Sequence, residues 1–323
     1  MRTLNLVRDL PNALRRNFSL PLAHALVRTR ATDPYVVSFP RSGSTWPRTI
    51  LARIIDPHAG YESEVFNRIL PGVSGPRFAL GVVAAGSANH SLAHHFSSLH
   101  SLYDLIAVPR TENVADAYAA GARKVRRVWF SADETLLGST ESLPGRMSQY
   151  GAEVSFIGSW MPERGPFMAK LIQRGVPLSI WGNGWQKAPE WPAIAPFWRG
   201  AGVYDERAYA SAIAAAKISL GLLSKGNRDL HTHRSVEIPS IGGLLCAERT
   251  SEHLALYDEG TEAVFWNDAA ECAAQCHRLL ADDDLRASIS KRGHERALRN
   301  NLFNEPLMAS IVKAVLDESD PIR

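Results

Sequence analysis

Short apolar runs alternate with amphipathic stretches along most of the chain after residue 151. Apolar runs of about four to eight residues bounded by turns are typical of buried strands, and apolar positions three or four apart are typical of helices. We expect strands within 153–160, 176–185, 218–224, 244–250 and 262–267, and helices within 166–175, 205–217, 233–243, 251–260 and from 268 to about 300. This alternation predicts an α/β domain with a Rossmann-like doubly wound parallel sheet.

The first 150 residues show a sparser form of the same pattern. We expect strands at 35–39, 103–109 and 124–130 and helices at 48–55 and 111–122. Residues 55–85 are rich in Gly and Pro and weakly patterned, which predicts a junction. The sequence therefore predicts a smaller, partial α/β region before the main domain, with divisions at 1–85, 86–150 and 151–323.

Composition narrows the class of protein. The chain has 323 residues, of which 45% are hydrophobic and 21% charged, and its net charge is only +3. These values are typical of a folded globular protein, and the weak charge argues against a nucleic-acid partner. Cys272 and Cys276 lie four apart, but no second pair of ligands completes a zinc site, so we expect buried thiols and no metal.

The N-terminus does not resemble a secretory signal. Its first 30 residues contain six Arg and one Asp, without a continuous apolar core, and no apolar run is long enough to span a membrane. We expect a cytoplasmic protein. Weak peripheral contact of the basic terminus with the inner membrane surface is an alternative.

A candidate anion loop follows the first strand. Residues 40–46, PRSGSTW, join a strand to a helix, so backbone N–H groups and Arg41 can face an anion, although a plain Ser/Gly turn is the alternative. VVSFPRSGSTW resembles the 5′-phosphosulfate loop of the sulfotransferase family. The resemblance implies that a phosphosulfate donor is held by Arg41, Ser42, Gly43, Ser44, Thr45 and Trp46. The other donor-binding loops of that family have no match in this chain.

Two polar clusters follow. His90, His94, His95 and His100 lie within eleven residues, but no carboxylate stands at a metal-ligand spacing, so a solvated helix is favoured over a metal site. The segment 225–243 places Arg234 at a helix start, where cations and free N–H groups suit a diphosphate. Glu237 can accept from two ribose hydroxyls or simply pair with Arg234. Gly242 and Gly243 would let backbone approach a flat ring or a diphosphate oxygen.

A second resemblance covers about residues 86–300. It rests on the ordered blocks 103–125, 154–185, 228–266 and 279–296, which resemble the glycosyltransferase-like domain of CgeB-type spore maturation proteins. The resemblance implies the C-terminal half of a GT-B glycosyltransferase, which binds the nucleotide-sugar donor. It implies donor-binding roles for Gly158, Arg164, Asp229, Arg234, Glu237, Thr250 and His253.

The resemblance implies a metal-independent glycosyltransferase that uses a UDP-, GDP- or TDP-linked sugar and a glycan or small-molecule acceptor. His90 and His94 are weak candidates for the catalytic base. Two alternatives stay open. One is a sulfotransferase that uses 3′-phosphoadenosine-5′-phosphosulfate, and the other is a nucleotide-binding protein without catalytic activity.

Overall fold

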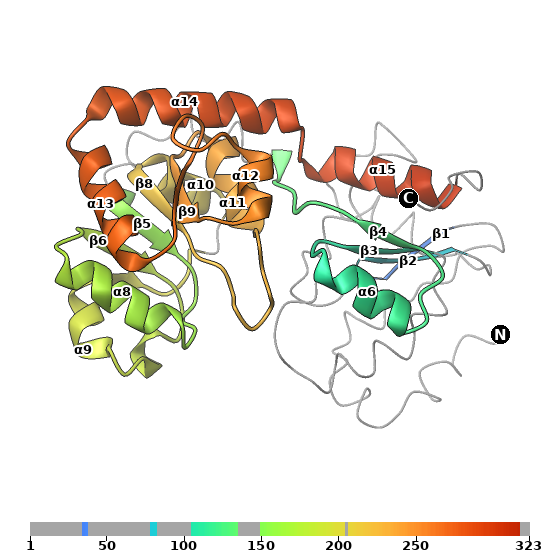
Figure 1. Cartoon of the computed structure of the whole chain (residues 1–323), viewed down its shortest axis with the longest axis horizontal. Coiled ribbons are helices and arrows are strands. Elements are labelled where there is room, and N and C mark those ends of the chain that lie inside the picture. Colours follow the sequence, from blue (N-terminus) through green and yellow to red (C-terminus); the bar gives the residue numbers. More distant parts are fainter. Residues whose placement is uncertain (1–33, 38–77, 83–104, 135–148, 204–205, 317–323) are drawn as a thin grey trace. The chain divides into compact units, whose positions relative to one another are not determined.

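The computed structural model describes residues 34–37, 78–82, 105–134, 149–203 and 206–316 (Figure 1). The chain forms two compact units. The first unit contains the described elements up to Trp129 together with the segment that begins at Asn304, and the second unit runs from Phe130 to Phe303. The predicted candidates Arg41, Ser42, Gly43, Ser44, Thr45, Trp46, His90 and His94 lie outside the described residues.

The first unit is built on a four-stranded parallel sheet in the order β1-β2-β3-β4. Its strands are β1 (Pro34–Val37), β2 (Phe78–Val82), β3 (Leu105–Val108) and β4 (Val125–Arg127). Helix α6 (Glu112–Ala119) connects β3 to β4, and α15 (Asn304–Leu316) is contributed by the C-terminal segment. Because side chains alternate along β3, Ile106 and Val108 pack on the α6 side while Leu105 and Ala107 pack on α15.

Basic side chains of the first unit hold its last helix. Lys124 Nζ donates to the Ala314 carbonyl at 3.0 Å, and Arg126 Nη1 donates to the Ser310 carbonyl at 3.2 Å. Arg127 lies over the Trp129 ring, 3.7 Å from its centroid. The basic cluster at this strand therefore has a structural use in binding carbonyls near the end of α15.

The first unit differs from its predicted organisation. Strand β2 lies inside the 55–85 segment that the sequence predicted to be a junction, and it pairs with both β1 and β3. The segments before and after residue 85 therefore share one sheet. Residues from Asn304 also belong to this unit, whereas the sequence placed them with the second, because Met308 and Ile311 pack on β3.

The second unit contains a six-stranded, fully parallel sheet in the order β10-β9-β8-β5-β6-β7. Its strands are β5 (Ala152–Ile157), β6 (Leu178–Trp181), β7 (Trp198–Gly200), β8 (Ala216–Gly221), β9 (Leu245–Glu248) and β10 (Val264–Trp266). The chain runs outward from β5 to β7 and then returns to β8, which pairs with the other side of β5. The sheet is therefore doubly wound, with its switch point between β5 and β8.

Helices cover both faces of this sheet. The helices are α8 (Arg164–Gln173), α9 (Trp191–Ile194), α10 (Glu206–Ala214), α11 (His233–Ile241), α12 (Ser251–Leu256), α13 (Ala269–Leu280) and α14 (Asp283–Asn300), with 3₁₀ turns η3 (Trp185–Lys187) and η4 (Ala195–Phe197). α8 and α13 pack on one face over a large apolar core, and α10 and α11 pack on the other. On that second face the hydroxyls of Ser155 and Ser219 lie 3.1 Å apart and form a buried hydrogen bond between strands.

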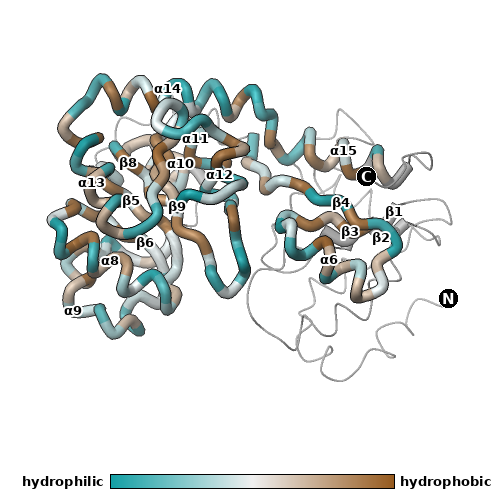
Figure 2. The backbone as a smooth tube through the Cα atoms, viewed as in Figure 1, coloured by the Kyte–Doolittle hydropathy of each residue, from teal (hydrophilic) through white to brown (hydrophobic). Residues whose placement is uncertain are grey.

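The helical stretch predicted from 268 to about 300 is two helices. Asp282 caps the N-terminus of α14, because its side chain accepts from the Leu285 N–H at 2.9 Å. The new helix therefore begins at Asp283, after α13 has ended at Leu280. The buried face of α14 repeats every three or four residues through Arg286, Ile289, Gly293 and Ala297. Figure 2 shows hydrophilic and hydrophobic residues alternating along this helix. Among the described residues, no helix combines the length and apolar character needed to cross a membrane.

Candidate functional site

The switch point of the sheet in the second unit lies between β5 and β8. They lie side by side, and the chain leaves their carboxyl ends toward opposite sides of the sheet. Helix α8 begins just after β5 and α11 after β8, so both helix N-termini lie at this edge. In open α/β sheets, ligands bind beyond the carboxyl ends of the strands at such a switch point. We call this region the carboxyl-edge site.

Gly158 fixes the end of β5. Its carbonyl accepts from Trp185 Nε1 at 3.0 Å, and a Cβ on the neighbouring Gly182 would lie 1.9 Å from the same oxygen. A Cβ on Gly158 itself would lie 2.7 Å from the Phe156 ring. The predicted donor residue Gly158 is therefore at the carboxyl-edge site, where it allows the ends of β5 and β6 to approach closely.

Arg164 lies beneath the carboxyl-edge site. It is the first residue of α8 and only 8% exposed. Its guanidinium joins the loops after the two central strands, since Nη1 donates to the Ser159 carbonyl at 2.7 Å and Nη2 to the Leu222 carbonyl at 3.4 Å. Burial lowers the pKa of Arg164, while the charges of Glu163 and Asp229 oppose that shift. Arg164 therefore places a positive charge between the loops that follow β5 and β8.

The first turn of α11 points its free N–H groups toward the same edge. Thr232 caps the helix and exchanges hydrogen bonds with Ser235, including one from the Thr232 N–H to Ser235 Oγ at 3.0 Å. A helix N-terminus carries a partial positive charge. The sequence positioned this helix start correctly, at residue 233.

Arg234 and Glu237 form an ion pair one turn into α11, between Arg234 Nη1 and Glu237 Oε2. Arg234 Nε also donates to the Ile157 carbonyl at 3.3 Å, which ties α11 to the end of β5. The Glu237 side chain is 16% exposed and that of Arg234 34%. Both predicted residues therefore lie at the switch point and are open to solvent.

Tyr209 of α10 completes this group. Its hydroxyl donates to Glu237 Oε2 at 2.6 Å, and its ring lies 4.4 Å from the Arg234 guanidinium carbon. Burial raises the pKa of Tyr209 well above its usual value, although the charge of Arg234 opposes this, so the phenol stays protonated and donates. Sequence reasoning missed Tyr209 because nothing in an Ala-rich helix signals its contact with a residue 28 positions away.

The ion pair sets the charge of Glu237. Burial alone would raise the pKa of Glu237, but the charges of Arg234 and His233 and the hydrogen bond from Tyr209 outweigh it and lower the pKa. Only Oε2 accepts these bonds. Within the described part of the chain, neither Glu237 Oε1 nor Arg234 Nη2 makes a hydrogen bond, so one acceptor and one donor remain for a ligand.

Asp229 serves the loop between β8 and α11. Its Oδ2 accepts from the Ser224 N–H at 3.3 Å, and its own N–H donates to the Ser224 carbonyl at 3.2 Å. Arg228 before it has φ of +56°, a backbone conformation that non-glycine residues seldom adopt. Asp229 is only 7% exposed, and its two hydrogen bonds to Ser224 stabilise the loop.

His253 and Thr250 support α11 from the side of β9. His253 is fully buried, with Nδ1 donating to the Glu248 carbonyl at 2.6 Å and Nε2 accepting from Ser235 Oγ at 2.7 Å. Thr250 caps α12 and donates to the Leu230 carbonyl at 2.6 Å. The two residues lie near the predicted place, but their polar atoms bind other groups of the protein, namely two backbone carbonyls and the Ser235 hydroxyl.

Lys225 and His231 also make long-range contacts around this loop. The Lys225 side chain, which is 59% exposed, pairs with Glu248 at the end of β9. His231 is buried and lies between two partners: Nε2 accepts from the Phe130 N–H at 3.0 Å, and Nδ1 lies 2.5 Å from Glu252 Oε2. Sequence reasoning identified none of these three contacts because each joins residues about 20 or more positions apart.

The structure places Gly242 and Gly243, which the sequence predicted to approach a ligand, away from the carboxyl-edge site. They lie at the end of α11, just before β9 begins, and therefore at the amino edge of the sheet. Gly242 ends the helix with φ of +91°. A Cβ on Gly243 would lie 2.7 Å from Ile213 Cγ2. These glycines serve helix termination and core packing.

The carboxyl-edge site is separate from two other features. A cavity of about 630 Å³ is lined by Tyr150, Trp181, Arg199 and neighbouring residues, and it includes none of Arg234, Glu237 or Tyr209. Among the described residues, the one group of three possible metal ligands consists of Cys246, Cys272 and Cys276, and all three are buried in the core.

The architecture is the Rossmann-like α/β fold of GT-B glycosyltransferases, which confirms the predicted fold class. Residues 164–308 match a family model described as glycosyl transferase-like. A comparison with curated proteins gives no match.

Solved structures resemble the chain at low sequence identity. Anabaena HepE (Alr3699) in complex with UDP-glucose has a TM-score of 0.60 and 10% identity, over 87% of this chain and 98% of that one. Sucrose-phosphate synthase from Thermosynechococcus elongatus has a TM-score of 0.54 and 13% identity, over 89% of this chain and 86% of that one. At such identities the likeness shows a shared fold.

Proposed function

We propose that this protein is a glycosyltransferase that binds a nucleoside diphosphate sugar at the carboxyl-edge site and transfers the sugar to a glycan or small-molecule acceptor. The match to a glycosyl transferase-like model includes α8 and α11, which supply the charged residues. Structures of the same fold were determined with UDP and with UDP-glucose. The finer assignment to the CgeB-type family stays part of this proposal.

The observation that carries the proposal is the group of Arg234, Glu237 and Tyr209. Glu237 Oε1 would accept from the ribose hydroxyls of the donor, since Oε2 is already held by the other two residues. Arg234 Nη2 and the first N–H groups of α11 would face the diphosphate. Arg164 contributes its charge from below, through the loops that it binds.

This arrangement suits transfer without a metal ion. Breaking the bond between sugar and diphosphate leaves negative charge on the nucleoside diphosphate. Arg234 and the N-terminus of α11 are already in place to stabilise that charge, which lowers the barrier. We propose that the donor is UDP-, GDP- or TDP-linked and that its transfer is metal-independent.

Two alternatives to this proposal make different predictions. A sulfotransferase would use Arg41–Trp46, and the match to a glycosyl transferase-like model does not favour it. A nucleotide-binding protein without activity would use the carboxyl-edge site and show binding but no turnover. We also keep a cytoplasmic location, with peripheral membrane contact of the basic N-terminus, as an expectation.

The test is calorimetric titration with UDP-, GDP- and TDP-glucose and with adenosine 3′,5′-bisphosphate, in the presence of a metal chelator. We expect at least one nucleotide-sugar to bind and Glu237→Ala to weaken it by more than about tenfold, because the variant removes a charged hydrogen-bond acceptor. Glu153→Ala is the matched control, since Glu153 lies near the amino end of β5 and pairs with Lys217. Equal affinity in wild type and Glu237→Ala, or binding of the bisphosphate alone, would contradict the proposal.

A further inference from the structure

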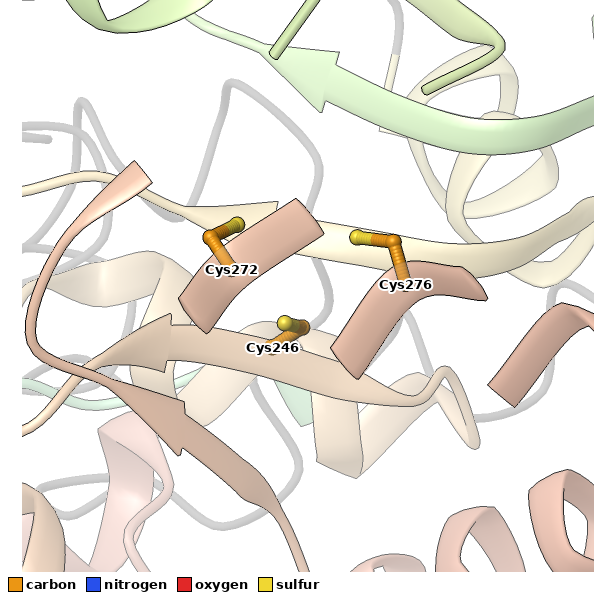
Figure 3. Close-up of side chains that lie close together, drawn as sticks. All are labelled: Cys246, Cys272 and Cys276. Atoms are coloured by element: carbon orange, nitrogen blue, oxygen red, sulfur yellow. The ribbon is translucent and has the colours of Figure 1, made fainter. Parts of the chain in front are cut away.

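Three cysteine side chains meet in the core of the second unit (Figure 3). Cys246 comes from β9, and Cys272 and Cys276 come from successive turns of α13, which packs against that face of the sheet. Their sulfur atoms all lie within 4.8 Å of one another. Each residue is 0% exposed, and these are all the cysteines of the chain.

The sulfur positions are close to those of a three-coordinate site. Bonds of about 2.3 Å from one ion to each thiolate place the sulfurs about 4 Å apart when the centre is planar, and closer together when it is pyramidal, as trivalent arsenic is. The three sulfur atoms lie within 4.8 Å of one another, so they would have to move inward to bind one ion. The sequence showed only the pair on the helix, and the third sulfur comes from a strand 26 positions earlier.

The surroundings restrict what can bind there. All three residues belong to the apolar core formed with side chains such as Leu220, Val264 and Leu279. Among the described residues, no His, Asp or Glu joins the three thiols, so the protein supplies no fourth ligand for tetrahedral zinc. A charged complex would be costly in such a core, whereas three thiolates around a trivalent centre carry no net charge.

The thiols also interact with one another. Hydrogen bonds from Cys246 and Cys272 lower the pKa of Cys276 to about 4, against the effect of burial. Hydrogen bonding to the other two cysteines, together with burial, raises the pKa of Cys246 well above its usual value.

We propose that Cys246, Cys272 and Cys276 form a closed three-thiolate site for a thiophilic three-coordinate centre, for which trivalent arsenic is the best-matched chemistry. With arsenous acid, three As–S bonds form and three As–OH bonds break. Each thiol proton leaves with one hydroxyl as water, so no electrons are gained or lost. This site is separate from the carboxyl-edge site and does not depend on the proposed transferase activity.

The experiment uses the reduced full-length protein, freed of reductant and exposed to arsenite either by long incubation or by refolding in its presence, because the thiols are buried. We expect native mass spectrometry to show one arsenic bound with loss of three protons, and X-ray absorption to show three sulfur neighbours. Cys246→Ala and Cys272→Ala should each lower the affinity by more than about tenfold, since losing even an outer-shell partner has effects of that order.

Two controls separate ligand loss from instability. Ile289→Val shortens another side chain of the same core and keeps all three thiols, so it should bind arsenite like the wild type. The variant with all three cysteines changed to Ala should bind none. Absence of an adduct by both loading routes would overturn the proposal and leave the cysteines as small apolar packing residues. Arsenic with fewer than three sulfur neighbours, or Zn²⁺ or Cu⁺ bound in preference to arsenite, would also overturn it.

Discussion

Tyr209 shows how a single hydroxyl can set the position of a binding residue. Its hydroxyl lies 2.6 Å from Glu237 Oε2, the same oxygen that Arg234 binds, so neither residue uses Oε1. Tyr209→Phe removes this hydrogen bond while keeping the ring beside Arg234. Loss of one hydrogen bond to a charged group costs about 1.5–3 kcal/mol.

We therefore expect Tyr209→Phe to weaken nucleotide-sugar binding by about tenfold or more in calorimetric titration, since tenfold corresponds to roughly 1.4 kcal/mol, just below that range. Tyr118→Phe is the control, because Tyr118 is 39% exposed in the first unit. Unchanged affinity in Tyr209→Phe would show that the hydroxyl does not position Glu237 for the donor.

His253 makes stability depend on pH. Burial lowers its pKa to about 4, with the bond from its Nδ1 to the Glu248 carbonyl opposing the shift. An unfolded His has a pKa of about 6.5, so between pH 6.5 and 4 the unfolded chain binds a proton that the folded chain does not. Stability is therefore lost as the pH falls through this window, by up to about 3 kcal/mol, and this residue adds no further loss below pH 4.

We expect urea unfolding to show a smaller loss of stability between pH 7.5 and 4.5 in His253→Asn than in the wild type, because Asn can still donate to the Glu248 carbonyl but does not titrate. Ala274→Ser, on the exposed side of α13, changes no titratable group and should keep the wild-type pH dependence. Parallel curves for wild type and His253→Asn would contradict this assignment.

Residue-level reasoning locates side chains best where chemistry and local position coincide. Arg234 and Glu237 were identified from a charged helix start, and the structure brings them together at the edge. Gly242 and Gly243 lie near those residues in sequence but at the opposite end of α11. A helix of nine residues separates its two ends by about 13 Å, so sequence proximity does not place both at one site.

At the level of elements, Gly293 limits how closely α14 approaches the turn that precedes β10. A Cβ there would lie 2.3 Å from the Glu262 carbonyl oxygen, which is backbone and cannot move aside easily. Gly293→Ala gains up to about 1 kcal/mol of helix propensity, but overpacking costs about 1–3 kcal/mol.

We expect Gly293→Ala to lower the free energy of unfolding by about 1–2 kcal/mol in urea titration. Gly226→Ala is the matched control, because a Cβ there meets no atom within 4 Å, and its stability should change little. An equal or greater stability for Gly293→Ala would mean that α14 is free to shift outward.

Element prediction followed the length and regularity of the apolar pattern. The strands of the second unit were predicted from apolar runs such as that of β8, and α11 from the segment 233–243 with its charged start. β7 was missed because it has only three residues, Trp198–Gly200. β2 was missed because Gly and Pro around Phe78–Val82 made the segment look like a junction.

At the scale of the whole molecule, the C-terminal helix returns to the first unit. α15 packs Met308 and Ile311 against Leu105 and Ala107 of β3. Sequence order alone cannot show this, because α15 follows directly on the second unit. The apolar face of the helix is visible in the sequence, but the sheet that it covers is not.

Ile311→Ala should therefore weaken the first unit by about 2–5 kcal/mol, the usual cost of truncating a fully buried Ile. We expect hydrogen exchange to speed up at the amides of β3 and to change little in β5 and β8. Faster exchange in β5 and β8 alone would contradict the division into units.

The central claim is that a nucleotide-sugar binds where β5 and β8 end, at the N-terminus of α11. Hydrogen exchange of the full chain, alone and saturated in turn with UDP-, GDP- and TDP-glucose, tests it most directly. We predict that at least one of them slows exchange in the 222–229 loop and the first turn of α11, with no change at Gly242 and Gly243. Protection confined to other parts of the chain, such as Arg41–Trp46, or no protection with any of the three, would contradict the account.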